Sequence, residues 1–531
     1  MADSAKEILF EEQAREKLKT GVEKLAKAVA ATLGPKGMNV GIDESFGAPK
    51  ITNDGGSIVQ TMELKDQYEN MGVSMGKEVA GKIKDKCGDG TTSGIILLNA
   101  LVQKGVKNIA SGASPIHIKR GMEKGLEKIL QEISKISIPV KSKQETENIA
   151  TVSASGDKEV GKMITEAFTK VGSDGVITIE EGKGTETTLE VVEGMQFDRG
   201  YLSAYFCTEQ EKRLVEMSHP RILLTDKKIN SVQDILPVLQ NAASAGEELL
   251  IIADDVEGDV LSTLVVNKLR GTLKVCAVKA PGFGDRRKAM LGDLAVLTGA
   301  TVVSEDAGMQ LKDAGPDVLG SAEKIEVSKD HTIIIGGKGK PDAVQARIHQ
   351  IENEINNAKS SYDIEKLQER KAKLSGGVAV IRVGAPTEPE MKQKKQIFED
   401  SLNSTTSAQE EGIVPGGGIA LLRASRAVDS LNLEEEEKLG AQILKEACIA
   451  PVRQIIQNSG FDPSIILEEI YPKENPFGFN AVTEKVEDLI QAGVIDPAKV
   501  VKNALHSAVS IAGVILISEA LIGEAPEDEN L

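Results

Sequence analysis

The chain changes character twice along its length, and this nested pattern limits its fold more than any single motif. Residues 1 to about 135, and most residues beyond about 390, have the apolar periodicity of amphipathic helices. Between them, short apolar runs such as "GVITIEEG", "RILLTDKK" and "ELLIIADD" alternate with helical stretches, which is typical of α/β structure. A chain of 531 residues is too long for one hydrophobic core, so we expect roughly three domains.

Charge and termini exclude several classes of partner. The chain has 63 basic and 81 acidic residues, a formal charge of -18, which repels nucleic acid and anionic membranes. The segment "MADSAKEILFEEQAREKL" has no signal-peptide or transit-peptide pattern. The apolar stretch 505–523 contains His506 and Glu519, so we expect a buried helix there and not a membrane span. Four widely spaced cysteines are typical of reduced thiols, and we expect a cytoplasmic protein.

The segment "CGDGTTSG" (87–94) lies between two predicted helices. Glycines let a backbone approach a ligand closely, and a helix that begins there points free N–H groups at an anion. The spacing matches neither the P-loop nor the Rossmann fingerprint. Asp89 beside bound phosphates suits a Mg²⁺ ion between them. The alternative is a glycine-rich helix cap in which Asp89 is only the capping residue.

Distant segments supply further candidates for the same site. The loop "TLGPKG" (32–37) offers backbone donors, and "PGGGIAL" (415–421) is another transition from glycines to a helix. In "GAPKITNDGGSIVQ" we expect a hairpin that turns at residues 53–56, which contain Asp54. Asp400 lies in a polar helix, where solvation is the alternative interpretation. The pattern by itself predicts a nucleotide site assembled from distant segments.

Several longer strings resemble the group I chaperonins, the bacterial GroEL type. They include "TLGPKG", "GDGTT", "VVEGMQFDRGYLS", "VKAPGFGDRRKAML", "YDIEKLQER", "GGVAVIRVGA" and "GFNA". The motifs occur in order from near residue 20 to near residue 520, and "APGFGDRRKAML" (280–291) is very specific.

This resemblance implies a multidomain α and α/β fold. A mostly helical equatorial domain for ATP binding and ring contacts would comprise residues 1–135 and 411–531. A small α/β intermediate hinge domain would comprise 136–192 and 379–410, and an α/β apical domain for substrate and co-chaperonin would comprise 193–378. The implied assembly is a homo-oligomer of two stacked sevenfold rings. It would bind non-native polypeptides and a GroES-type co-chaperonin, and ATP would drive its cycle.

The resemblance also implies roles for individual residues. Asp400 would orient the attacking water with help from Asp54, since phosphoryl transfer depends mainly on positioning and electrostatics. Asp89 would bind Mg²⁺, and the backbone carbonyl of Asn53 would help to hold K⁺. The full set of implied nucleotide-binding residues is Thr32, Leu33, Gly34, Pro35, Asn53, Asp89, Gly90, Thr91, Thr92, Ser93, Gly417, Asn480, Ala481, Val482 and Asp496.

An apolar groove for non-native polypeptides is implied in the central domain. In "DVLSTLVVNKL" (259–269) apolar residues cover more than one helix face, which indicates a binding surface. Without the resemblance these positions would be interpreted as core. The residues implied to form the groove are Tyr201, Tyr205, Phe206, Leu236, Leu239, Leu261, Val265 and Val266.

The sequence departs from the family pattern at several points. Asn53 replaces a Lys, Ser93 a Thr and Phe479 a Tyr. The segment "NSTTSAQEEG" after Asp400 lacks the usual Ala-Thr-Arg pattern, and the C-terminal "EAPEDENL" lacks a Gly-Gly-Met tail. We therefore expect a divergent paralogue. An ATP-driven folding machine is the favoured function, followed by a holdase with weak assembly or weak ATPase. The apolar groove argues against the third class, a small-molecule ATP-dependent enzyme.

Overall fold

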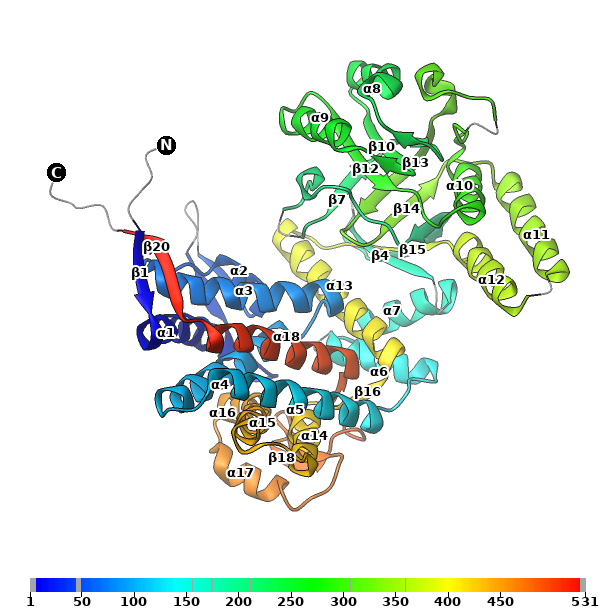
Figure 1. The fold of residues 1–531 in the computed structure, drawn as a ribbon. Helices are drawn as coiled ribbons and strands as arrows, with labels where there is room; N and C mark the ends of the chain where they lie inside the picture. The colour runs from blue at the N-terminus through cyan, green and yellow to red at the C-terminus, as the bar shows by residue number, and fades with distance from the viewer. Residues whose placement is uncertain are drawn as a thin grey trace. The chain divides into compact units, whose positions relative to one another are not determined.

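The computed structural model describes residues 6–43, 49–154, 156–172, 175–182, 184–210, 212–304, 307–358 and 360–525. The chain forms two compact units, one of residues 1–165 with 396–531 and one of residues 166–395 (Figure 1). Both unit boundaries fall inside the segments that we assigned to an intermediate domain, so the three-domain division remains a prediction. The absent Gly-Gly-Met tail concerns residues 526–531, which lie outside the described residues.

Unit 1, residues 1–165 with 396–531, is mainly helical. Its long helices pack against one another through apolar faces that form one core. Their bounds are α1 Glu11–Ala30, α3 Gln67–Cys87, α4 Thr91–Ala110, α5 Pro115–Ile136, α15 Glu435–Ala447 and α18 Ala498–Ile517. The shorter helix α6, Lys143–Ser153, packs through Ile149 in a separate small cluster. Shorter elements are α2 Gly55–Thr61, β16 Ile413–Pro415, α14 Ile419–Ala424, α16 Ala450–Asn458, α17 Pro463–Ile470, β17 Phe477–Asn480, β18 Lys485–Asp488 and β19 Ile495–Pro497. Two helices continue across a unit boundary, α7 Lys158–Val171 and α13 Glu388–Glu411.

Helix α18 confirms the buried helix expected at 505–523 as far as Ile517, and the stretch then leaves the helix and enters a strand at Ala520. The helix is long and apolar enough to cross a membrane, but 67% of its most apolar window is buried inside the protein. It packs against α3, α4 and α5 in the middle of unit 1. A helix that is apolar on most faces is stable only when neighbouring helices cover it, so α18 serves as the central helix of this core.

Glycines let helices α1 and α3 cross at close range. A Cβ atom on Gly21 would lie 1.9 Å from the carbonyl oxygen of Glu69, and one on Gly72 would lie 2.3 Å from that of Leu18. No side chain fits in either place, because real Cβ atoms do not approach within 3.0 Å. The crossing fixes α3, whose C-terminal end leads into the glycine loop.

The expected hairpin turn at residues 53–56 is wrong. Strands β2 (Val40–Ile42) and β3 (Lys50–Thr52) do pair antiparallel, but the chain then enters α2 directly. The Asp54 carboxylate caps this helix by accepting hydrogen bonds from the backbone N–H groups of Gly56 and Ser57. An Asp followed by small residues suits a turn and a helix N-cap equally well. Nearby, β1 (Lys6–Phe10) pairs antiparallel with β20 (Ala520–Glu524), so the two ends of the described chain lie side by side (Figure 1).

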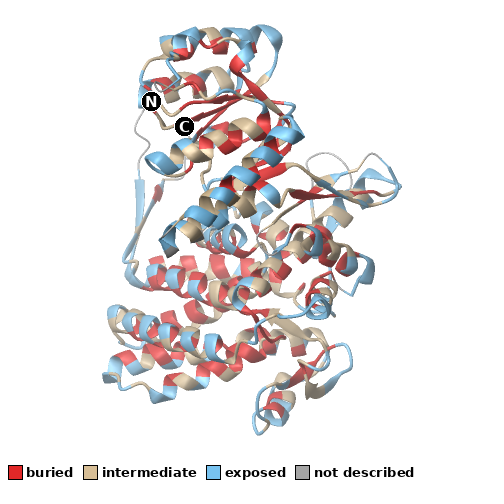
Figure 2. Cartoon of the chain, turned by 90° about the vertical axis from the view of Figure 1, so that its right-hand side faces the viewer, coloured by how far each residue is buried: buried red, intermediate tan, exposed pale blue. Residues whose placement is uncertain are grey.

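Unit 2, residues 166–395, is α/β. Among its described residues, one sheet has seven strands in the order β12-β10-β8-β13-β14-β6, with β7 also paired to β13. Strands β8, β10 and β12 are parallel to each other, whereas β13 is antiparallel to β8, β14 and β7. The strand bounds are β6 Gly194–Phe197, β7 Val215–Ser218, β8 Arg221–Leu224, β10 Glu248–Ala253, β12 Lys274–Lys279, β13 Gly320–Val327 and β14 Thr332–Gly337. Much of this sheet is buried (Figure 2).

Helices and a smaller sheet complete unit 2. Strand β15 (Val378–Val383) lies between β4 (Val176–Glu181), which is parallel to it, and β5 (Thr188–Val192), which is antiparallel. The charged segment 341–375 contains helices α11 and α12, which pack against each other. Among the described residues 300–304, Val303 forms an isolated parallel bridge with Thr225. Remaining bounds are β9 Lys228–Ile229, α8 Val232–Ala245, β11 Asp255–Val256, α9 Gly258–Leu269, α10 Asp285–Thr298, α11 Pro341–Asn357 and α12 Ser361–Ser375.

Candidate functional site

The glycine loop joins α3 to α4 through two residues with left-handed backbone. Gly88 has φ 70° and Gly90 has φ 91°, conformations that side chains other than glycine rarely adopt. A Cβ on Gly88 would lie 2.2 Å from the side-chain nitrogen of Asn403, and one on Gly90 would lie 2.6 Å from Cγ1 of Val500. Backbone conformation and available space therefore both require glycine at residues 88 and 90. Without side chains there, the backbone of the loop is left uncovered at these two positions.

Helix α4 begins at Thr91 without a side-chain cap among the described residues. The first N–H groups of a helix have no partner inside it, and the helix dipole places positive charge there. Thr91, Thr92 and Ser93 are partly exposed and add hydroxyl groups at this end. This end of a 20-residue helix has the donors that an anion such as a phosphate group requires.

Helix α2 brings Asp54 to the same end of α4. A Cβ on Gly55 would lie 2.0 Å from the hydroxyl oxygen of Thr92, so the two helix starts are in direct contact. Asp54 is partly buried, and Asn53 next to it is exposed. The structure thus brings together two segments, residues 53–55 and 91–93, that we assigned to one site.

Asp400 on α13 faces the same region. Burial, together with the negative charge of Asp89 and that of Asp54, raises the pKa of Asp400 to about 7. A hydrogen bond from Gln396 opposes this rise. A bound cation would offset the negative charge that surrounds Asp400. Perturbed acids of this kind are typical of functional sites.

Asp496 is the fourth acid in this group. It lies on β19, paired with Val414 on β16. Burial and then the charge of Asp89 raise the pKa of Asp496 to about 7. A Cβ on Gly416 would lie 3.2 Å from an Asp496 carboxylate oxygen, so the glycine run at 416–418 leaves space beside this acid.

The residues assigned to the nucleotide base side lie in two further segments. Thr32 is buried and its hydroxyl donates to the Val29 carbonyl, while Gly34 (φ 86°) turns the loop. Asn480 and Ala481 are buried, and Val482 is 69% exposed. Among the described residues, no hydrogen bond or ion pair joins either segment to the four acids. The ion pair of Lys36 with Glu484 instead joins the two segments to each other.

Three residues that hold this site were missed at the sequence level. Asn458 donates to the carbonyls of Ala30 and Leu33, at 2.8 Å and 2.9 Å, and so fixes the loop at 32–37. The Ser404 hydroxyl donates to Oδ2 of Asp89 at 3.0 Å. The Gln396 side chain donates to Asp400. Gln396 is one helical turn from Asp400 and spacing could have identified it, whereas the other two act across hundreds of residues.

The site fits a Mg²⁺–nucleotide by its donor set. Among the described residues, no group of three or more His, Cys, Asp or Glu side chains could hold a metal ion alone. Mg²⁺ commonly takes one or two carboxylates and completes its shell with water and substrate phosphates. Asp89, placed beside the donor-rich start of α4, suits that arrangement. The residues present therefore fit a Mg²⁺ ion and a nucleotide, two of the groups that we expected.

The residues assigned to the apolar groove, all in unit 2, divide into three sets by exposure. Tyr205 (64% exposed), Leu236 (37%) and Val266 (43%) lie at the surface, and Tyr201, Leu261 and Val265 are partly buried against the core. Phe206 and Leu239 are buried at 0% and 8% exposure, so in this conformation their side chains are not accessible to a polypeptide, and their assignment to the groove stays a prediction. Their apolar side chains complete the core of the larger sheet.

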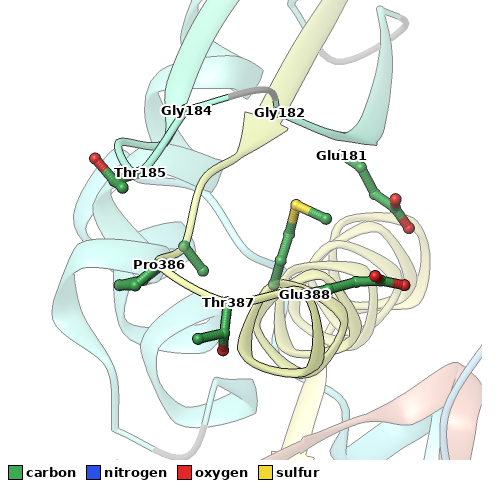
Figure 3. Close-up of a pocket in the computed structure, with 9 residues that line it drawn as sticks. Glu181, Gly182, Gly184, Thr185, Pro386, Thr387 and Glu388 are labelled. Atoms are coloured by element: carbon green, nitrogen blue, oxygen red, sulfur yellow. The ribbon is translucent and has the colours of Figure 1, made fainter.

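An open pocket of about 520 Å³ in unit 2 was not predicted (Figure 3). It lies where β4 ends and α13 begins, and Glu181, Thr185, Thr387 and Glu388 are among the residues that line it. It shares no residue with the candidate nucleotide site or with the apolar groove.

A helical unit with a donor-rich, acid-lined helix start and an α/β unit with exposed apolar side chains are consistent with the class of protein that the resemblance implies, the chaperonins. The TCP-1/cpn60 chaperonin family model matches residues 25–526, so the chain belongs to this family. It is 64% identical over 524 residues to Chaperonin GroEL 3 of Protochlamydia amoebophila (strain UWE25), which covers 99% of this chain and 98% of that protein. The resemblance to GroEL-type chaperonins and the multidomain α and α/β fold are therefore confirmed, and the chain is an ATP-dependent chaperone.

Proposed function

We propose that this chaperonin hydrolyses ATP at the α4 site and uses the cycle to fold non-native polypeptides. The observation that supports this most directly is the convergence of three acids: Ser404, on the helix that carries Asp400, donates to Asp89, and the start of the helix capped by Asp54 contacts Thr92. The charges of Asp89 and Asp54 also raise the pKa of Asp400. A holdase that does not hydrolyse ATP would not need a partly buried carboxyl group, Asp400, whose charged form is destabilised. The match to a GroEL protein along the whole chain also favours the folding machine over the holdase.

In the proposed mechanism the start of α4 binds the phosphates through its backbone N–H groups and the hydroxyls of residues 91–93. Asp89 would hold Mg²⁺, which neutralises phosphate charge when bound. Asp400, once ionised, accepts a hydrogen bond from the attacking water and orients it, while Asp54 adds negative charge beside it. Each residue positions a group or supplies charge, which is the main protein contribution to phosphoryl transfer.

The remaining expectations belong to the same proposal. Non-native polypeptides would bind the exposed part of the apolar groove, which contains Tyr205, Leu236 and Val266. The working form would be two stacked sevenfold rings in the cytoplasm, closed by a GroES-type co-chaperonin. K⁺ would bind near the backbone carbonyl of Asn53, whose side chain is exposed and uncharged.

Steady-state ATP hydrolysis tests the proposal directly. The full chain is assayed with Mg²⁺ and K⁺ after light scattering has established its size, alongside Asp400→Ala. We expect turnover by a ring-sized species and a loss on the order of 10²-fold in the variant, because a positioned acid contributes about that much. Turnover no higher than that of the variant, or small oligomers alone, contradicts the proposal. A refolding assay with and without ATP then separates a folding machine from a holdase.

A further inference from the structure

Ser404 contacts the carboxylate that the site offers to a metal ion. Its hydroxyl donates to Oδ2 of Asp89 at 3.0 Å, and its side chain is almost fully buried at 1% exposure. The other carboxylate oxygen, Oδ1, accepts from the backbone N–H of Gly90. One donor therefore holds each oxygen of Asp89, and together they fix the plane of the carboxylate.

The same helix makes a second contact with the glycine loop. Asn403 lies so close to Gly88 that any side chain at Gly88 would collide with its amide nitrogen. Asn403 and Ser404 follow Asp400 by three and four residues, so all three lie on one face of α13. That face is turned toward residues 88–90.

A hydrogen bond within unit 1 holds α13 in this position. The Ser401 hydroxyl donates to the carbonyl of Ala150 on α6 at 2.7 Å, while the Thr405 hydroxyl donates to the carbonyl of Ser401 inside α13 itself. Both residues are fully buried. The geometry of Ser404 therefore depends on a packed helix, and its hydroxyl has few other directions in which to donate.

We propose that Ser404 is a positioning residue that sets the orientation of Asp89 for Mg²⁺ and couples it to the helix that carries Asp400. This inference rests on the proposed function and adds to it a residue from the segment that departs from the family pattern. A hydrogen-bonded carboxylate keeps its oxygens in a fixed direction, and such outer partners typically change metal affinity by 10–100-fold. Because Ser404 and Asp400 share one helix face, the metal ligand and the water-orienting acid keep a fixed spacing.

The test compares Ser404→Ala with Ser404→Thr, which retains the hydroxyl, and with the control Ser407→Ala on the same helix. The binding of a fluorescent ADP analogue is titrated at a series of Mg²⁺ concentrations, on intact oligomers of the full chain. We expect the Mg²⁺ midpoint to rise by about 10-fold in Ser404→Ala and to stay near the wild-type value in the other two. With ATP at saturating Mg²⁺, kcat of Ser404→Ala should recover most of the wild-type value, unlike that of Asp400→Ala.

Three outcomes overturn the inference. An unchanged Mg²⁺ midpoint in Ser404→Ala shows that the hydroxyl does not position Asp89. Equal shifts in Ser404→Ala and Ser404→Thr, with lower unfolding temperatures in both, assign the effect to packing. If the wild-type protein shows no Mg²⁺-dependent nucleotide binding at all, the proposed function itself fails and the inference fails with it. If the wild-type protein shows Mg²⁺-dependent nucleotide binding and Ser404→Ala has the same Mg²⁺ midpoint, only the inference about Ser404 fails and the proposed function stands.

Discussion

The side-chain amide of Gln396 donates a hydrogen bond to Oδ1 of Asp400 at 2.7 Å. The two residues are one turn apart on α13, so the helix itself sets the contact. The bond stabilises the charged form of Asp400 and lowers its pKa, against the larger effects of burial and of the Asp89 charge. The balance leaves Asp400 with a pKa of about 7, where a small change in surroundings alters its charge.

Gln396→Leu should move the pH dependence of ATP turnover. Loss of the donor raises the pKa of Asp400 further above its ordinary value, so the acid limb of kcat/KM shifts to higher pH. Turnover falls at pH 7 and recovers toward pH 8.5. The measurement is a pH–rate profile beside the control Gln442→Leu, which removes a surface hydrogen bond to Glu446. An acid limb that stays in place in Gln396→Leu would show that ionised Asp400 is not required.

Asp400→Asn should lose activity and gain stability. The folded-state pKa of about 7 lies above the ordinary value of 3.8, so the folded protein binds this proton more tightly than the unfolded chain. The resulting stability is complete below about pH 4 and is lost as the pH rises through 7. Asparagine avoids that loss, and we expect an unfolding temperature higher by on the order of 2 °C at pH 8, with a smaller gain at pH 5. Thermal unfolding of ligand-free protein at both pH values checks this, and a gain that does not depend on pH would contradict it.

The sequence predicted the local structure around the site better than the contacts between its distant segments. The helix start at Thr91 follows from local signals, because glycine residues before an apolar periodic run predict an N-terminus. Asp54 was expected in a turn and caps a helix instead, since the same short-range chemistry serves both. The sequence pattern offered Asp54, Asp89 and Asp400 as candidates for one site, each of them weak by itself, and only the family resemblance gave them joint roles. No periodicity encodes a contact across more than 300 residues.

Helix periodicity also could not separate core from surface on α8 and α9. Leu239 and Leu264 are buried, whereas Val266 on the same apolar stretch as Leu264 is exposed. When a helix has apolar residues on more than one face, the sequence does not show which of these faces packs against the sheet. Strand β13 was not predicted for a different reason. The run "SAEKIEV" alternates with charged residues and gives a weak strand signal.

The ion pair of Lys36 with Glu484 should slow the release of nucleotide. It joins the loop at 32–37 to the turn after Asn480, both of which were assigned to nucleotide binding. Lys36→Glu replaces attraction by repulsion, and we expect ADP release to be up to about five-fold faster, the scale of an exposed pair. The double variant Lys36→Glu with Glu484→Lys restores the attraction and the slower release. Stopped-flow fluorescence of labelled ADP measures the rates, and the difference should fade in 1 M KCl. Failure of the double variant to restore the wild-type rate would contradict this role.

Asp293→Ala should destabilise unit 2 strongly. Asp293 on α10 is fully buried and accepts hydrogen bonds from Arg347 on α11 and Arg370 on α12, each Nε at 2.7 Å. Removing the acid leaves two partly buried guanidinium groups without it, which typically costs about 3–5 kcal/mol. Urea unfolding followed by circular dichroism, and limited proteolysis at the α11–α12 connection, measure the effect. The control Glu388→Ala removes an exposed pair with Lys392 and should have no measurable effect. Equal unfolding curves for the two variants would contradict the prediction.

Substitutions on α9 should separate polypeptide binding from folding of the chaperonin itself. Val266 and Leu269 are 43% and 61% exposed, while Leu264 on the same helix is 0% exposed. Val266→Ser and Leu269→Ser remove apolar surface that only a bound polypeptide would cover, so capture of a denatured protein should weaken several-fold with an unchanged unfolding temperature. Leu264→Ala instead leaves a cavity, and it should lower stability by about 2–5 kcal/mol. Suppression of aggregation of a denatured test protein, read beside thermal unfolding, distinguishes the two effects. Because Leu269 is not among the residues implied by the resemblance, weakened capture in Leu269→Ser would extend the binding surface beyond them. Full capture by both serine variants would place the polypeptide elsewhere on unit 2.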